Sequence, residues 1–130
     1  MADSYYTPGV CNINPKESAY RRRFGIGFGA LGLIGLAVAL AVHAPSWVGI
    51  ALFLFYWISA LSFLQAKNHF CVNYAASGKY NVSDEFGDIA QATAEQHKKD
   101  TLRARRMHIQ AVLIGIGCAL IATAALYIVK

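Results

Sequence analysis

The sequence predicts an all-α protein in which three helices cross a membrane and extend into the cytoplasm. The chain has 130 residues, of which 56% are hydrophobic and 15% charged, whereas soluble domains carry about a quarter charged residues. Two runs, Phe24–Ala66 and Ile109–Val129, contain no Asp, Glu, Lys or Arg. A small soluble globule could not bury such runs, and their apolar content also excludes a disordered chain.

Three segments are long enough to span a bilayer, because about 20 apolar residues cover roughly 30 Å of hydrocarbon. They are Phe24–Val42, Trp47–Ala66 and Ile109–Val129. Only residues 43–46 separate the first two, which predicts a tight turn and an antiparallel helical hairpin. The first segment is not expected to be a cleaved signal peptide, because its apolar run is longer than the usual 7–15 or so residues.

The domain organisation follows from these spans. We expect a cytoplasmic tail over residues 1–14 and a single membrane domain over residues 15–130, with its cytoplasmic connection at residues 67–108. The stretch Asn14–Glu17 places Asn at an N-cap, Pro at the first helical position and Glu at the third. The first helix is therefore expected to begin at Pro15, outside the bilayer.

Local signals also set the expected ends of the other helices. No helix breaker lies between Ala66 and Gly78, so the second helix is expected to continue to that glycine, a natural C-terminal cap. Ser83, followed by two acidic residues, predicts the start of the third helix and leaves a loop near Lys79–Val82. Glu95 and Lys99 are spaced as a favourable ion pair on that helix.

The distribution of basic residues predicts the orientation in an inner (plasma) membrane. Eleven of the twelve lysines and arginines precede the first span or lie between the second and third, and only Lys130 lies at the far end. The N-terminus is therefore expected in the cytoplasm and the C-terminus outside. This asymmetry explains the net charge of +5, so anionic lipid headgroups are the expected partners and nucleic acid is not. The expected headgroup contacts are Arg21, Arg22, Arg23, Arg103, Arg105 and Arg106.

The spans contain no Asp, Glu, Lys, Arg or His, since His43 lies in the turn. Proton relays, ion pathways and voltage sensors require such groups within the membrane. A phosphate-binding glycine loop and a His-Glu-x-x-His zinc motif are also absent from the sequence. We therefore expect a protein that is not an enzyme, with no catalytic residue and no resident cofactor.

Small residues recur at helical spacing in two spans. In lipid, helices associate through close packing, and small residues let their backbones approach. These faces could pack within one chain or join it to copies or larger partners. Because three helices offer limited surface to one another, the sequence favours a structural or accessory protein that self-associates or docks in a larger membrane complex. The residues of the expected interface are Gly25, Gly29, Gly32, Gly35, Gly115 and Ala119.

Polar residues occur at every third position of the second helix, and they wind around it rather than share one face. They could form interhelical hydrogen bonds or line a water-filled path in an oligomer. The series is Tyr56, Ser59, Ser62, Gln65, Asn68 and Cys71.

The cysteines offer a second function class. Cys11 and Cys71 are both expected in the cytoplasm, where stable disulfides are rare. With His69, and with His97 or His108 as further donors, they could bind zinc or iron in a membrane-anchored metal or redox protein, although the diagnostic ligand spacing is absent. Cys118 lies within a span and is expected to act as a small packing residue.

Two motifs carry a resemblance to known proteins. Residues 11–17 read Cys-Asn-Ile-Asn-Pro-Lys-Glu and precede three arginines and Gly25, and Phe-Leu-Gln-Ala at residues 63–66 precedes Phe70, Cys71 and Gly78. Together they resemble the two signatures of a family of small bacterial integral membrane proteins, over roughly residues 11–82. That family has no established activity. The resemblance implies a bacterial origin and places Cys11 and Cys71 in one structural unit.

Overall fold

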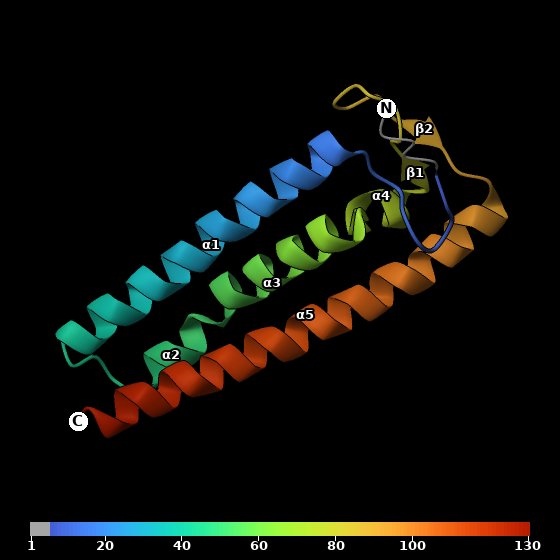
Figure 1. Cartoon of the computed structure of the whole chain (residues 1–130). Coiled ribbons are helices and arrows are strands. Elements are labelled where there is room, and N and C mark those ends of the chain that lie inside the picture. The colour runs from blue at the N-terminus through green and yellow to red at the C-terminus, as the bar shows by residue number, and fades with distance from the viewer. Residues whose placement is uncertain (1–5) are drawn as a thin grey trace.

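The computed structural model describes residues 6–130 and is all-α, apart from two short strands (Figure 1). Helix α1 spans Pro15–Ala41, and the second crossing consists of α2, Trp47–Ala51, and α3, Phe53–Asn68. Helix α4 spans Val72–Ser77, and the long α5 spans Ala94–Ile128. Strands β1, Lys79–Tyr80, and β2, Ala90–Gln91, form an antiparallel pair. Within the described residues, three helices are long and apolar enough to cross a membrane, which confirms the predicted fold class.

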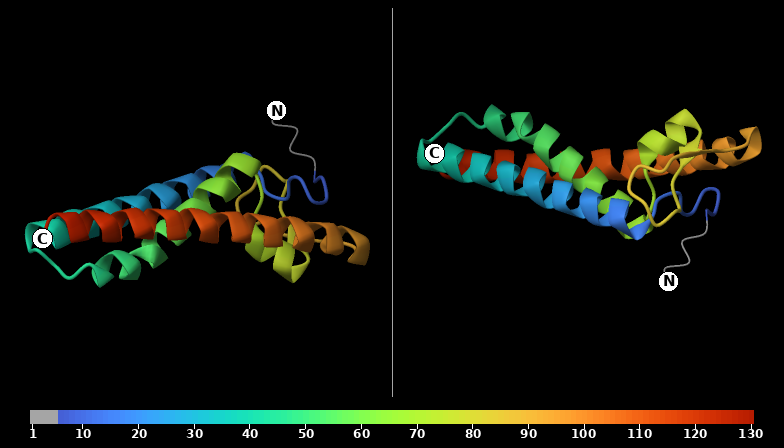
Figure 2. Two further views of the ribbon diagram at one scale, coloured as in Figure 1. Left: turned by 90° about the horizontal axis from the view of Figure 1, so that it is seen from below. Right: turned by 90° about the horizontal axis from the view of Figure 1, so that it is seen from above.

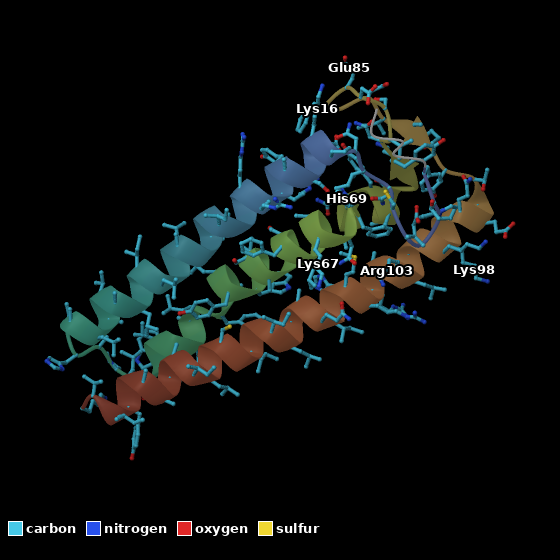
Figure 3. The ribbon with its side chains drawn as sticks, viewed as in Figure 1. Lys16, Lys67, His69, Glu85, Lys98 and Arg103 are labelled. Carbon is cyan, nitrogen blue, oxygen red and sulfur yellow. The ribbon has the colours of Figure 1, made fainter. Side chains whose placement is uncertain are left out.

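Helix α3 lies between α1 and α5, which have few contacts with each other (Figure 1). Seen from below, the second crossing runs obliquely across α5 (Figure 2). The turn between α1 and α2 lies at the same end of the bundle as the C-terminus (Figure 1). At the other end lie residues 6–14, the first turns of α1 and α5, and the connection of residues 69–93. We call this end the cap. The charged side chains of Lys16, Glu85 and Lys98 lie there (Figure 3).

Several local signals act as predicted. Asn14 is the N-cap of α1, and its Oδ1 accepts a hydrogen bond from the backbone N–H of Glu17 at 2.8 Å. Gly78 ends α4 in the left-handed conformation with φ +67°. Lys99 and Glu95 form an ion pair at 3.3 Å. These features depend on neighbours within four residues, which is why the sequence reveals them.

The prediction that the second helix continues to Gly78 is wrong. It ends at Asn68, because His69 adopts a left-handed conformation with φ +49°. The His69 carbonyl accepts the backbone N–H groups of Asn12 at 3.0 Å and Ile13 at 3.2 Å, and Phe70 is fully buried. Burial of a large side chain and pairing with a distant segment compensate the cost of about 1–2 kcal/mol for a left-handed residue.

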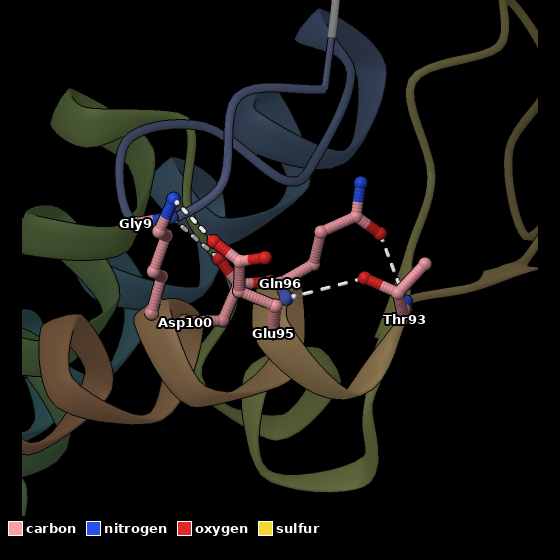
Figure 4. Close-up of polar contacts among 6 residues, drawn as sticks. Gly9, Thr93, Glu95, Gln96 and Asp100 are labelled. Atoms are coloured by element: carbon pink, nitrogen blue, oxygen red, sulfur yellow. Dashed lines mark hydrogen bonds and ion pairs between the residues drawn. The ribbon is translucent and has the colours of Figure 1, made fainter.

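The predicted helix start at Ser83 is also wrong. Helix α5 begins at Ala94, where Thr93 and Gln96 form a capping box (Figure 4). The Asn14 side chain donates to the carbonyls of Ser83 at 2.7 Å and Glu85 at 3.0 Å. These bonds hold residues 83–85 in a non-helical path, and Gly87 then turns the chain with φ +78°. The predicted loop near residues 79–82 instead contains strand β1.

Candidate functional site

The glycine-rich face of α1 packs against α3 of the same chain. A Cβ atom added to Gly29 would lie 2.9 Å from the Ser59 hydroxyl, and one added to Gly32 would lie 2.7 Å from the Tyr56 ring. The same test places Gly25 against Phe63 and Gly35 against Leu52. The expectation that a three-helix chain has too little internal surface for these glycines is therefore wrong.

Hydrogen bonds reinforce this contact within the expected spans. The Ser59 hydroxyl donates to the Gly25 carbonyl at 2.7 Å, and the Tyr56 hydroxyl donates to the Gly32 carbonyl at 3.2 Å. The interhelical interpretation of the polar series is confirmed at these two positions. In lipid, such bonds remove the cost of leaving a hydroxyl without a partner.

The contact of the second crossing with α5 is equally close. A Cβ atom added to Gly115 would lie 3.0 Å from the Trp57 backbone, and one added to Gly49 would overlap the Thr123 backbone. Ala119 is buried in the core between these helices, and Cys118 packs against that core as predicted. Sequence reasoning missed Gly49, although a lone glycine in an apolar span is a signal of close backbone approach.

Buried polar side chains hold the cap together. Glu17 is only 2% exposed, and its Oε1 accepts hydrogen bonds from the Tyr74 hydroxyl at 3.0 Å, the Asn81 amide at 3.1 Å and the Gly87 N–H at 3.2 Å. Its Oε2 has no hydrogen-bond partner among the described residues. Burial, followed by the hydrogen bond to Glu17, raises the pKa of Tyr74 to about 12. One carboxylate thus joins α1, α4 and the connection between β1 and β2.

The tail of residues 6–14 completes the cap. Asn12 accepts a hydrogen bond from the Cys71 N–H at 2.6 Å and donates to the Cys71 carbonyl at 3.1 Å. Tyr6 and the N–H of Gly9 both donate to Asp100 of α5 at 2.7 Å (Figure 4 shows the Gly9 contact). Burial and the bond to Asp100 raise the pKa of Tyr6. Residues 6–14 are therefore a packed part of the fold rather than a separate tail.

The predicted metal ligands lie in this cap, but each has a different neighbour. The Cys71 thiol is fully buried and accepts a hydrogen bond from Arg21 at 3.1 Å, and His69 Nδ1 lies 2.8 Å from the Ser18 hydroxyl. The Cys11 thiol donates to the Ile13 carbonyl at 3.6 Å, and burial raises its pKa, which disfavours the thiolate that a metal requires. Within residues 6–130, no three His, Cys, Asp or Glu side chains form a group that could hold a metal.

The six predicted headgroup arginines divide into two kinds. Arg21 donates to Cys71, and Arg103 donates to Asn68 Oδ1 at 2.9 Å. The remaining four are exposed and make no hydrogen bond or ion pair with a described residue. These four are Arg22, Arg23, Arg105 and Arg106.

The outer face of α1 carries a groove that the sequence analysis did not single out. Its walls include the rings of Tyr20, Phe24 and Phe28, with centroids 6.2 Å and 4.8 Å apart in that order. Its volume is about 630 Å³, and a Cβ atom added to Gly27 would meet no atom within 4 Å. The sequence does contain a signal for it, because these three aromatic residues are four positions apart and therefore share one face of a helix. We call this surface the Gly27 groove.

The three apolar helices give the chain the build of a small multi-pass membrane protein. No protein-family model, curated protein or solved structure matches it. The glycine contacts, the cap and the outer groove are therefore the features that bear on its function.

Proposed function

We propose that this chain is an architectural protein of a plasma membrane, which joins a second copy or a larger assembly through the Gly27 groove. The groove is the single observation that carries the proposal. Its floor lacks a side chain at Gly27, and its walls include the rings of Phe24 and Phe28. A neighbouring membrane helix could therefore approach the α1 backbone closely while its side chains contact Phe24 and Phe28.

A groove on the lipid-facing side of a helix favours association, because a neighbouring helix can pack into it. Lipid chains are as apolar as the side chains they meet, so helix association in a membrane depends on close packing. The Gly25–Gly35 face already has its partner in α3, whereas Gly27 has none within the described chain. Association therefore uses a different face of α1 from the one that its glycine spacing predicts. The protein performs no catalytic chemistry of its own in this proposal.

The mass of the assembly in mild detergent tests the proposal. The native protein is expected to run as a species larger than its 14.1 kDa chain. Gly27→Leu should reduce it to the single chain without unfolding it. Gly117→Leu is the matched control, because Gly117 is also exposed in a span and has no atom within 4 Å of an added Cβ.

Two outcomes would contradict the proposal. One is a native protein that runs as a lone chain under several gentle conditions, and the other is equal loss of the larger species in both leucine variants. Helix content, measured by circular dichroism, must stay unchanged in each variant. Gly29→Leu is unsuitable here, because it would disturb the contact between α1 and α3 of the same chain.

We also propose that the cap faces the cytoplasm, on the basis of the basic residues that lie toward it. A cysteine at Lys98 should react with an impermeant thiol reagent only after cells are permeabilised, and one at Ser46 should react from outside. Labelling is compared with that of the native chain. Cys71 is not a suitable reporter, because it is fully buried. Reaction of the Lys98 variant in intact cells would reverse the orientation.

A further inference from the structure

A second groove, of about 520 Å³, lies between α3, α4 and α5, beside the cap. It lies where the apolar part of α5 begins, at Ile109. We call it the Arg105 groove. We call its apolar lining residues the wall and its polar lining residues the rim. The wall includes Trp57, Leu61 and Ile109, and the rim includes Asn73, Arg105 and His108.

The break in the second helix creates this groove. At His69 the chain leaves the line of α3, and α4 then lies against α5 (Figure 1). Helix α4 thereby contributes Asn73 and Ala76 to the lining of the groove, and α5 contributes Arg105. A helix that continued straight to Gly78 would lack this side wall, so the feature that sequence reasoning missed is also the one that forms the site.

Arg105 is a free cation at the rim. It is exposed and has no hydrogen bond or ion pair with any described residue, whereas Arg103, two residues earlier, is bonded to Asn68. Asp100 of the same helix already accepts hydrogen bonds from Tyr6 and Gly9. The ring of His108 lies edge-on to Trp57, with centroids 5.3 Å apart. The groove therefore combines a free positive charge with an aromatic and aliphatic lining.

We propose that the Arg105 groove binds one anionic phospholipid from the leaflet on the cap side of the membrane. The lipid phosphate binds Arg105, whose planar guanidinium can donate two parallel hydrogen bonds to phosphate oxygens. An acyl chain lies along Trp57, Leu61 and Ile109. Basic pockets between membrane helices bind anionic headgroups in this way. A zwitterionic lipid is a weaker ligand, because its own cation competes with Arg105 for the phosphate.

This inference does not rest on the Gly27 groove, which lies on a different helix. Native mass spectrometry of the full chain in mild detergent tests it, with equimolar phosphatidylglycerol and phosphatidylcholine added. The native chain is expected to retain phosphatidylglycerol in preference to phosphatidylcholine. Arg105→Gln should lower that retention about tenfold, the usual consequence of losing a charge-assisted hydrogen bond.

Arg106→Gln is the matched control. Arg106 is the next residue of α5, is also exposed and unpaired among the described residues, and does not line the groove. Its loss should change retention by no more than about twofold, because Arg106 does not contact a lipid in the groove and its attraction from a distance is screened by salt. Equal losses in the two variants would overturn the site and indicate general attraction to a basic surface.

Two further measurements test whether the lipid occupies the groove and whether its acyl chain contributes to binding. Ala76→Phe fills the groove without changing charge and should reduce retention of both lipids; unchanged retention would contradict binding in the groove. Inorganic phosphate at millimolar concentration should not displace phosphatidylglycerol, since it cannot use the apolar wall. Displacement by phosphate would overturn the assignment to a lipid.

Discussion

The membrane-spanning part and the cap are held together by different means. In the spans, α1 and α5 approach α3 through glycine and alanine, as at Gly32 and Ala119. In the cap, buried polar side chains such as Asn12, Glu17 and Asn81 join segments that lie far apart in the sequence. The spans therefore depend on small side chains that allow close packing, and the cap depends on specific hydrogen-bond donors and acceptors.

This difference follows from the two solvents. Lipid gives helices no hydrophobic reason to associate, so close contact must supply the attraction. Outside the hydrocarbon, buried polar groups stabilise a fold when each has a partner and destabilise it when one is removed. The spans should therefore be sensitive to added size, and the cap to lost hydrogen-bonding groups.

The largest effect is expected for Glu17→Ala. The hydroxyl of Tyr74, the amide of Asn81 and the N–H of Gly87 would lose their common acceptor in a buried site. We expect the free energy of unfolding to fall by about 3 kcal/mol or more, because each buried donor left without a partner costs about 1–3 kcal/mol. Denaturation in mixed micelles, followed by circular dichroism, measures it.

Glu17→Gln is the control for that prediction. Its amide oxygen can still accept from the three donors, and the carboxylate atom that it replaces, Oε2, has no described hydrogen-bond partner. The loss should therefore be much smaller than for alanine. Equal losses in the two variants would show that the charge, rather than the acceptor atom, holds the cap.

A smaller effect is expected from added volume in the spans. Gly49→Leu places a side chain against the Thr123 backbone, and Gly32→Leu places one against the Tyr56 ring. Overpacking of this kind costs about 1–3 kcal/mol. Gly117→Leu should cost little, because nothing lies within 4 Å of its added Cβ. If Gly49→Leu proved as stable as Gly117→Leu in the same denaturation assay, close packing would not be what holds the spans.

Local signals predicted much of this fold, and distant contacts account for the errors. Asn14 and Gly78 act within a few residues of themselves, so their capping roles could be inferred from the sequence. The break at His69 depends on Asn12, which lies far earlier in the chain, and on burial of Phe70. The non-helical path of residues 83–85 depends on Asn14 in the same way.

The candidate surfaces show a similar division. Spacing identified Gly29 and Gly32 as packing residues, but it could not tell whether their face meets α3 or another chain. Gly27 lies only two residues from Gly29, yet two residues turn a helix by about 200° and bring it to the outer face. Similarly, the arginine count could not reveal that Arg103 is bonded inside the chain while Arg105 is free. Which face of a helix is covered depends on tertiary packing.

The smallest expected effect is a pH dependence in the cap. The pKa of Tyr74 is raised to about 12, whereas an unfolded tyrosine has a pKa of about 10. A raised pKa means that the folded state favours the protonated phenol, so this stabilisation is fully present below about pH 10 and is lost as the pH rises towards 12.

Tyr74→Phe removes both the titration and the hydrogen bond to Glu17. At pH 8 the variant should be less stable by about 1 kcal/mol. The stability of the native chain minus that of the variant should then fall continuously between about pH 10 and pH 12, and Tyr6 cancels from this difference because both chains contain that residue. Denaturation curves at pH 8, 10, 11 and 12 measure the difference. A native-minus-variant stability that stays constant or rises over this range would contradict the placement of the Tyr74 hydroxyl on the Glu17 carboxylate.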